Sequence, residues 1–159
     1  MYHYCHKCPF GFIHIYANDN GITQIKIDDL PSDCTEFITD DIKKCIIQFD
    51  EYFEGIRKEF DLNLIIEGTE FQKKVWSALS KIPYGKTASY KDIAISIGNP
   101  NASRAVGNAN NKNKFWIVIP CHRVIASDGA LSGYAGKEWL KEALIKFEAE
   151  NSKEWSYEI

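Results

Sequence analysis

The residues best suited to chemistry are a cysteine and a histidine that stand side by side, Cys121 and His122, inside an apolar run from Ile117 to Ile125. A thiol buried among Ile and Val has a raised pKa and is inert, whereas an adjacent imidazole can take its proton and leave a thiolate nucleophile. The run therefore permits two opposite interpretations, a core cysteine beside a packed histidine or an activated nucleophile. The surrounding sequence must decide between them.

Size and composition are those of an ordinary globular protein. The 159 residues suffice for one domain with a full core, or for a small domain joined to a larger one, and 45% of them are hydrophobic. No apolar run approaches membrane-spanning length, and the N-terminus lacks the pattern of a secretion signal. Five cysteines, an odd number, fit free thiols better than a disulfide framework. We therefore expect a cytoplasmic protein.

Charge is unevenly distributed along a chain whose net charge is -3. Residues 1–70 carry 6 Lys and Arg against 14 Asp and Glu, residues 71–124 carry 9 against 1, and residues 125–159 carry 4 against 7. A basic block inside an acidic protein is typical of a nucleic-acid-binding surface, although lysines on a solvated face produce the same pattern. Charge alone leaves both interpretations open.

Residues 1–66 are expected to form a small N-terminal α+β domain with a structural role. Residues 9–16 and 22–27 are rich in β-branched and aromatic side chains and flank turn-forming residues, which predicts a β-hairpin. Apolar residues at helical spacing predict a helix over residues 35–55, and residues 60–66 are predicted to form a short strand. No stretch here carries a constellation typical of a catalytic site.

Residues of metal-ligating types crowd the N-terminus: His3, Cys5, His6 and Cys8. A structural zinc needs a second pair of ligands, and the other cysteines of this domain stand at no recognisable spacing. We therefore expect these side chains to be polar or half-buried positions on a terminal strand, and we expect no metal and no cofactor.

Residues 68–151 are expected to form a mostly helical C-terminal domain, followed by a tail over residues 152–159. A capping box that starts at Thr69 predicts a first helix, and a second start signal stands at Ser89. A third helix is expected over residues 101–110. Two short helices joined by a tight Gly-containing turn are typical of a helix-turn-helix.

The third helix is rich in small residues, and Arg104 is the long side chain it offers. Small residues let a helix backbone approach a narrow surface, which suits the minor groove of DNA, but tight packing against a neighbouring helix explains them equally well. The candidates for DNA contact on this helix are Ala102, Ser103, Arg104, Ala105 and Gly107.

A glycine-rich loop with one phenol, Tyr134, follows the apolar run, and a last helix is expected over residues 137–150. Glu148 lies at the edge of the buried face of that helix. Most glutamates at such an edge are solvated. If a histidine of the site needs a carboxylate to orient it, Glu148 can supply that carboxylate.

Five consecutive residues, Pro120-Cys121-His122-Arg123-Val124, are thus preceded by the predicted helix-turn-helix and followed by Gly133-Tyr134-Ala135-Gly136 and a glutamate-bearing helix. This ordered set resembles the O6-alkylguanine-DNA alkyltransferases. The resemblance covers residues 69–150 without an internal gap and is weak before them. It implies a DNA-repair enzyme that binds double-stranded DNA through the minor groove, flips an alkylated guanine into a pocket and moves the alkyl group, chiefly methyl, from O6 to its own cysteine. It also allows O4-alkylthymine as a second lesion.

Carried over by motif, Cys121 is the alkyl acceptor, His122 is its base through a water molecule, and Glu148 orients the histidine. Because the product is a thioether with no leaving step, the protein is consumed in one turnover. Thiolate chemistry supports these roles independently, since a neutral imidazole accepts the thiol proton and a carboxylate fixes the imidazole tautomer. We expect residues 117–119 to form the buried strand that holds the cysteine at the pocket floor.

The resemblance implies further roles. Tyr134 is similar to the phenol that hydrogen-bonds the flipped base and helps the guanine leave, and Arg104 to the side chain that fills the vacated place in the base stack. Tyr90 is similar to the residue that turns the 3′ phosphate, and Asn113 to the asparagine that braces the active-site segment. Arg123 is a further candidate for DNA contact, Lys141 for support of the pocket, and the pocket itself is expected to be lined by Tyr90, Trp116, Val124, Tyr134 and Ala135.

Two departures from the family pattern concern the pocket. The family loop usually continues Gly-Tyr-x-Gly-Gly-Leu, whereas this chain has Gly136-Lys137-Glu138, and Trp116 stands where smaller residues or proline are common. The bulk of the indole leads us to expect that methyl adducts are repaired well and benzyl adducts poorly.

Three other classes of protein fit the sequence less well. A non-catalytic damage sensor of the same fold would lack the acceptor cysteine, and a transcription regulator would need longer side chains on its recognition helix. A cysteine hydrolase would need turnover and an oxyanion site. We therefore expect a monomeric DNA-repair enzyme that has no membrane contact.

Overall fold

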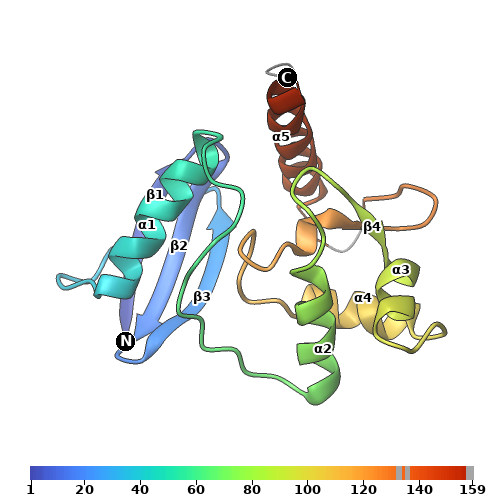
Figure 1. Cartoon of the computed structure of the whole chain (residues 1–159). Helices are drawn as coiled ribbons and strands as arrows, with labels where there is room; N and C mark the ends of the chain where they lie inside the picture. The colour runs from blue at the N-terminus through green and yellow to red at the C-terminus, as the bar shows by residue number, and fades with distance from the viewer. Residues whose placement is uncertain (132–133, 135–136, 157–159) are drawn as a thin grey trace. The chain divides into compact units, whose positions relative to one another are not determined.

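The computed structural model of the chain describes residues 1–131, 134 and 137–156, with side chains up to residue 152 (Figure 1). The chain forms two compact units. The first unit comprises Met1–Ile66 together with Lys114–Trp116, and the second comprises Glu67–Asn113 and the chain from Ile117 onward. The fold is mixed α+β, as expected, and each unit is described by itself below.

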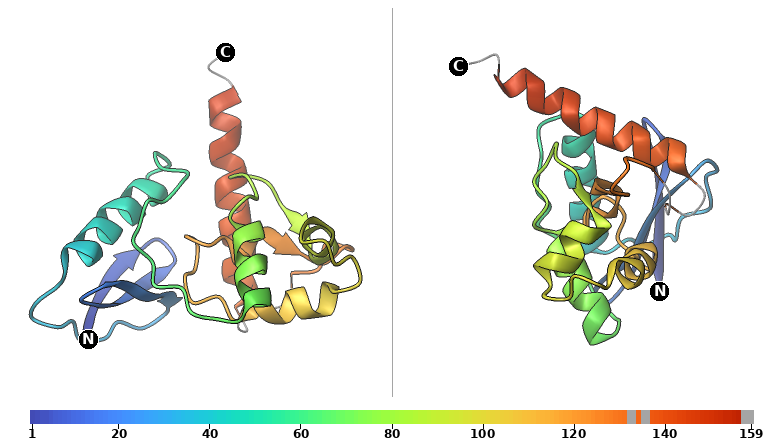
Figure 2. Two further views of the ribbon diagram at one scale, coloured as in Figure 1. Left: turned by 60° about the horizontal axis from the view of Figure 1, so that its bottom comes forward. Right: turned by 90° about the vertical axis from the view of Figure 1, so that its right-hand side faces the viewer.

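The first unit is a three-stranded antiparallel sheet with one helix on its face. The strands β1 (Tyr2–Cys8), β2 (Gly11–Asn18) and β3 (Gly21–Asp28) follow one another in the order β1-β2-β3. Helix α1 (Asp40–Phe53) contacts all three strands, and Figures 1 and 2 show it lying along one face of the sheet. The hydroxyl of Thr39 caps this helix by accepting a hydrogen bond from the backbone N–H of Ile42.

The core of the first unit lies between α1 and the sheet. In the strand register Ile13 pairs with Ile27, and Ile15 pairs with Ile25. These alternate positions share one face of the sheet, which buries them together. The fully buried residues of the helix and the strands are Ile13, Ile15, Ala17, Ile22, Ile25, Ile42, Cys45, Phe49 and Tyr52.

Two segments outside the regular strands pair with the sheet through single residues. The expected hairpin is present as β2 and β3. The prediction of a strand over residues 60–66 is wrong, because in this stretch only Leu64 forms a bridge, to Ile22. Phe115 bridges to Ile25 in the same way, with hydrogen bonds from Ile25 N–H to the Lys114 carbonyl (2.7 Å) and from the Trp116 N–H to the Ile25 carbonyl (3.1 Å). The sequence interpretation, which ended this domain at residue 66, did not include this later segment.

The second unit is mostly helical and includes one very small parallel sheet. Helix α4 packs against both α2 and α3, and the 3-10 turn η1 packs against α2 and α5. The arrangement can be followed in Figure 2. Its elements are α2 (Glu70–Leu79), β4 (Ala88–Ser89), α3 (Tyr90–Ser96), α4 (Ser103–Asn111), η1 (Cys121–Arg123), β5 (Val124–Ile125) and α5 (Glu138–Ser156).

Local capping signals fix the starts of two of these helices. Thr69 and Gln72 form a reciprocal capping box at the start of α2, and Ser89 and Asp92 form another at the start of α3. Helix α5 continues to Ser156, so the expected tail from residue 152 begins inside a helix. Among the residues that the structure describes, no helix has both the length and the apolar character to span a membrane.

Residues 117–119 form a turn and not the expected strand. Ile117 has a φ of 71°, a left-handed conformation that is strained for a β-branched residue and incompatible with a strand. Pro120, with φ -78° and ψ 64°, then bends the chain so that the Cys121 N–H reaches the Ile119 carbonyl at 2.7 Å. The apolar run is buried, but its backbone turns sharply before the cysteine.

Candidate active site

Cys121 is the first residue of η1, and only 3% of it is exposed. Asn113 braces the turn before it by donating an amide hydrogen bond to the Ile119 carbonyl at 2.8 Å. The side chains of Asn113 and Tyr134 both lie close enough to the thiol to lower its pKa. Residues separated in sequence by the whole of the apolar run therefore converge on one sulfur atom.

The surroundings of Cys121 act on its pKa in opposite directions. Burial raises the pKa of the thiol, while the Asn113 hydrogen bond, the charge of Lys141 and the Tyr134 hydrogen bond lower it. The balance is a raised pKa, so the resting group is a thiol. The pKa of Tyr134 lies well above its usual value, because of burial and of the charge that Cys121 carries as a thiolate. Tyr134 therefore stays a phenol that can donate to the sulfur.

His122 is fully buried, and its two ring nitrogens have different environments. Nε2 lies 2.7 Å from Oε2 of Glu148. Nδ1 has no hydrogen-bond partner within the described part of the chain. A carboxylate that accepts from Nε2–H leaves the lone pair of a neutral imidazole on Nδ1, so Nδ1 is the nitrogen available to take a proton.

Arg123 has a different position from the one expected. It was expected to contact DNA, but only 6% of it is exposed, and its Nη1 donates to the Ile82 carbonyl at 2.8 Å. Its Nε and Nη2 donate to the two carboxylate oxygens of Glu148 at 2.7 and 3.1 Å. A guanidinium held in this way is unavailable to a phosphate, so Arg123 has a supporting role in place of the expected DNA contact.

Glu148 connects the histidine and the arginine. Burial alone would raise the pKa of this carboxyl, but the charges and hydrogen bonds of His122 and Arg123 outweigh burial and hold it well below the ordinary value of 4.5. Glu148 is therefore a carboxylate at any physiological pH. It can orient the imidazole and stabilise an imidazolium without itself taking up a proton.

Tyr90 is held close to the cysteine by the small parallel sheet. Ala88 pairs with Val124 and Ser89 with Ile125, which fixes the first residue of α3 beside the segment that follows η1. Burial raises the pKa of Tyr90, and the charge that Cys121 carries as a thiolate raises it further. The ammonium of Lys141, a buried residue, lies 5.7 Å from the centre of the Tyr90 ring.

The expected DNA-contacting residues lie on and just before α4. Arg104 and Ala105 are exposed, and Ala102, Ser103 and Gly107 are partly exposed. The structure thus leaves these side chains accessible, but it does not bring them into the cluster around Cys121.

The expected pocket residues fall into three groups. Tyr90, Tyr134 and the fully buried Val124 belong to the second unit. Trp116 belongs to the first unit, where its backbone pairs with Ile25. Ala135 lies outside the described residues. The effect of the indole and of the altered loop on adduct size therefore stays a prediction.

The N-terminal histidines and cysteines are spread over different partners. His6 pairs with Asp50 at 2.7 Å, whereas His3 stacks on Tyr16 and lies 3.3 Å from a ring nitrogen of His14. Within the residues that the structure describes, no three His, Cys, Asp or Glu side chains are grouped so as to hold a metal ion.

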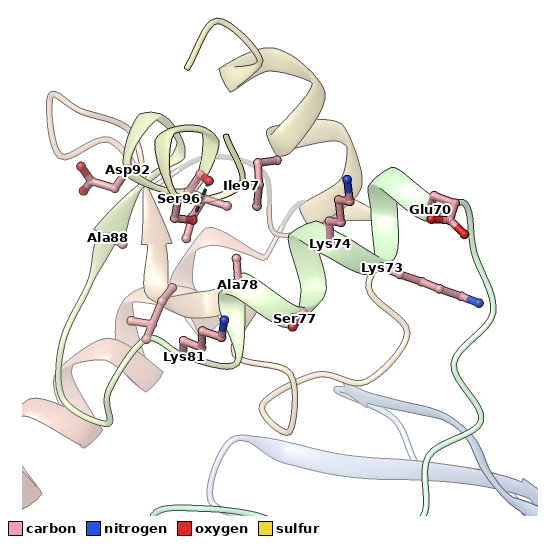
Figure 3. A pocket seen from close by; sticks show the side chains of 12 residues that line it. Glu70, Lys73, Lys74, Ser77, Ala78, Lys81, Ala88, Asp92, Ser96 and Ile97 are labelled. Atoms are coloured by element: carbon pink, nitrogen blue, oxygen red, sulfur yellow. Dashed lines mark hydrogen bonds between the residues drawn. The ribbon is translucent and has the colours of Figure 1, made fainter. Parts of the chain in front are cut away.

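A separate hollow of about 620 Å³ lies between α2 and α3 (Figure 3). Lys73 and Lys74 of α2 and Lys81, which follows that helix, line it, and Asp92 and Ser96 stand on the α3 side. Neither Cys121 nor the three side chains that lower its pKa, Asn113, Tyr134 and Lys141, line this hollow. The hydrogen-bond network, and not this hollow, therefore defines the candidate active site.

Two features of the site escaped the interpretation of the sequence. The pairing of Arg123 with Glu148 crosses 25 residues and has no local signal. Asn110 is a polar residue at 2% exposure in α4. Its spacing from Val106 and Asn113, four and three residues away, was a signal that it faces inward.

Comparison with known proteins agrees with this geometry. Residues 70–150 match the family described as "6-O-methylguanine DNA methyltransferase, DNA binding domain", and residues 1–66 match the "6-O-methylguanine DNA methyltransferase, ribonuclease-like domain". The chain belongs to the 6-O-methylguanine DNA methyltransferase family.

Individual relatives carry the name methylated-DNA–protein-cysteine methyltransferase. The protein from Methanosarcina barkeri is 46% identical over 157 residues, which cover 95% of this chain and 99% of the relative. The constitutive protein from Bacillus subtilis is 53% identical over 108 residues, 67% of this chain and 66% of the relative. The crystal structure of Mycobacterium tuberculosis OGT in complex with DNA superposes with a TM-score of 0.82 at 38% identity, covering 92% of each chain.

Proposed function

We propose that this protein repairs alkylated DNA by moving a methyl group from O6 of guanine to the sulfur of Cys121. Membership of the family gives the class of reaction, methyl transfer from DNA to a protein cysteine. The observation that supports Cys121 as the acceptor is its place beside a buried His122–Glu148 pair, with the side chains of Asn113 and Tyr134 close to the thiol. The other four cysteines of the chain all lie in the first unit.

In the proposed reaction, Nδ1 of His122 takes the thiol proton through a water molecule while Glu148 holds Nε2–H. The thiolate attacks the methyl carbon, a sulfur–carbon bond forms, and the carbon–O6 bond breaks with its electron pair passing to the guanine. Tyr134 donates a hydrogen bond to the base and helps it leave. The thioether has no leaving step, so each chain acts once. Since burial keeps the resting thiol protonated, removal of its proton is part of the reaction's barrier.

DNA is proposed to bind along α4, with α3 and α4 acting as a helix-turn-helix that lies in the minor groove. The exposed Arg104 would fill the space left by a flipped nucleotide, and Tyr90 would turn the 3′ phosphate. The excess of Lys and Arg in residues 71–124, 9 against a single acidic residue, supports a surface for a polyanion. The remaining proposals are that the protein acts as a monomer and that O4-alkylthymine is a second lesion.

The test is to incubate the protein with duplex DNA that contains O6-methylguanine and to determine the mass of its peptides. We expect a single added methyl on the Cys121 peptide, no more than one per chain, and none in Cys121→Ser. An unmodified Cys121 peptide despite tight DNA binding would point to a damage sensor and overturn the proposal. A methyl on another cysteine would overturn the assignment of the acceptor.

A further inference from the structure

Asn110 is a buried amide that the mechanism above does not use. It lies in α4 at 2% exposure, and within the described chain neither its amide nitrogen nor its amide oxygen has a hydrogen-bond partner. Buried polar groups are almost always hydrogen-bonded, and an amide that lacks every bond is costly to the fold. An apolar side chain of similar size would stabilise this position better, so the amide calls for an explanation in function.

The neighbours of Asn110 show which side of α4 it occupies. Residues three apart lie above one another on the same side of a helix. Three residues before it, a Cβ added to Gly107 would lie 3.8 Å from the ring of Tyr90. Three residues after it, Asn113 lies close enough to the Cys121 thiol to lower its pKa, and the Asn113 N–H donates to the Asn110 carbonyl at 3.3 Å, which continues the turn of the helix. Along the chain, Asn110 thus stands between a position that faces Tyr90 and a residue that acts on Cys121.

We propose that Asn110 is a specificity-determining residue whose amide hydrogen-bonds the polar edge of the flipped base. This inference rests on the proposed function, since it needs the base to enter the space beside Cys121. A primary amide offers a donor and an acceptor about 2 Å apart, the arrangement with which Asn and Gln recognise base edges in pairs of hydrogen bonds.

The chemistry of the two lesions decides which one this amide favours. O6-alkylguanine presents a 2-amino donor beside ring nitrogens that accept, so both groups of Asn110 find partners. O4-alkylthymine presents acceptors alone on the corresponding edge, so the amide oxygen would stay unbonded in a dry site, which is penalised heavily. Asn110 therefore selects guanine lesions over thymine lesions.

The test combines a change in the protein with a change in the base. Asn110→Leu keeps the branched outline of the side chain and removes both polar atoms, and O6-methylhypoxanthine is O6-methylguanine without its 2-amino group. Single-turnover methylation of Cys121 is measured for both chains on duplexes that carry each base. We expect Asn110→Leu to slow repair of O6-methylguanine by about 10-fold or more and to change repair of O6-methylhypoxanthine by less than about threefold.

Controls separate this inference from folding and from the proposed function. Thermal unfolding of Asn110→Leu should occur at the same temperature as in wild type or higher, and the exposed neighbour variant Asn111→Leu should keep the wild-type preference between the two bases. Unchanged rates in Asn110→Leu, or equal losses on both bases, would overturn the role of Asn110. A wild-type chain that gains no methyl on Cys121 would instead overturn the proposed function itself.

Discussion

Arg123 and Glu148 lie side by side in the interior, with Nε and Nη2 of the guanidinium 2.7 and 3.1 Å from the two oxygens of the carboxylate. Oε2 of the same carboxylate also lies 2.7 Å from Nε2 of His122. One buried anion therefore holds both residues that follow Cys121. The orientation of the histidine therefore depends on a buried charge pair.

Loss of the Glu148 charge should be costly to stability. In Glu148→Gln the Arg123 guanidinium would remain buried beside a neutral amide, and breaking a buried pair in this way costs about 3–5 kcal/mol. Urea unfolding measures the change. Glu150→Gln, an exposed change on the same helix, should stay within about 0.5 kcal/mol of wild type. A cost below about 1 kcal/mol for Glu148→Gln would contradict the pairing described above.

The same pair should make stability depend on pH in the acid range. The folded-state pKa of Glu148 lies below the ordinary value of 4.5. At acid pH this carboxyl is therefore protonated in the unfolded chain while it is still ionised in the native state. The stabilisation is therefore complete above about pH 6 and is lost as the pH falls through 4.5 toward the folded-state pKa. Urea midpoints of wild type and Glu148→Gln should converge between about pH 6 and pH 3. A difference that stays constant over this range would count against the assignment.

Removal of the Tyr134 hydroxyl should raise the pKa of Cys121. The phenol is one of the groups that lower the thiol pKa against the effect of burial, so in Tyr134→Phe less thiolate forms at a given pH. We expect methyl transfer at pH 7 to slow by about 10-fold or more, since a hydrogen bond to a charged group is worth about 1.5–3 kcal/mol. The single-turnover rate should recover as pH is raised. A profile of unchanged shape would show that the phenol acts on the base alone, and Tyr4→Phe in the first unit serves as a control.

Substitution by alanine at two glycines should change the stability of the protein in opposite directions. Gly107 lies inside α4, and its added Cβ makes ordinary contact with the Tyr90 ring at 3.8 Å. Gly107→Ala should therefore stabilise the protein by about 0.5–1 kcal/mol. Gly85 has a φ of 80°, and a Cβ there would collide with the side chain of Ser152. Gly85→Ala should destabilise by more than about 1 kcal/mol.

Thermal unfolding of the two glycine variants checks these signs. If α4 approaches DNA as closely as proposed, Gly107→Ala should also bind duplex DNA more weakly despite its higher stability. A destabilised Gly107→Ala would contradict the packing of α4 against Tyr90.

The parts of the fold that were predictable are those whose signals are local. The caps at Thr69 and Ser89 were readable because the donor and the acceptor stand three residues apart. The turn at residues 117–119 was not readable, because a buried turn and a buried strand can have the same apolar sequence. The strained φ of Ile117 has no counterpart in the residue types of this stretch. Arg123 was assigned to DNA because a basic residue shows its charge in the sequence but not its partner.

The reacting residues of the site were predictable from the sequence, whereas the residues that hold them in position were less so. Cys121, His122 and Glu148 were brought together by a resemblance that fixed their order, and the structure adds the distances. The unbonded state of Asn110 and the burial of Arg123 depend on contacts far apart in the chain, which no local pattern encodes.

The pairing of residues 114–116 with Ile25 has a consequence for how the protein can be divided. The chain passes between its two units three times, after Ile66, after Asn113 and after Trp116. A fragment that begins at residue 67 would keep Asn113, Tyr134 and Lys141, which lower the pKa of the thiol, yet residues 114–116 would have lost their backbone partner in the sheet. The peptide bond from Asn113 to Lys114 thus joins a residue that braces the turn before Cys121 directly to a residue at the edge of the N-terminal sheet. Neither unit is therefore a single continuous segment of the chain.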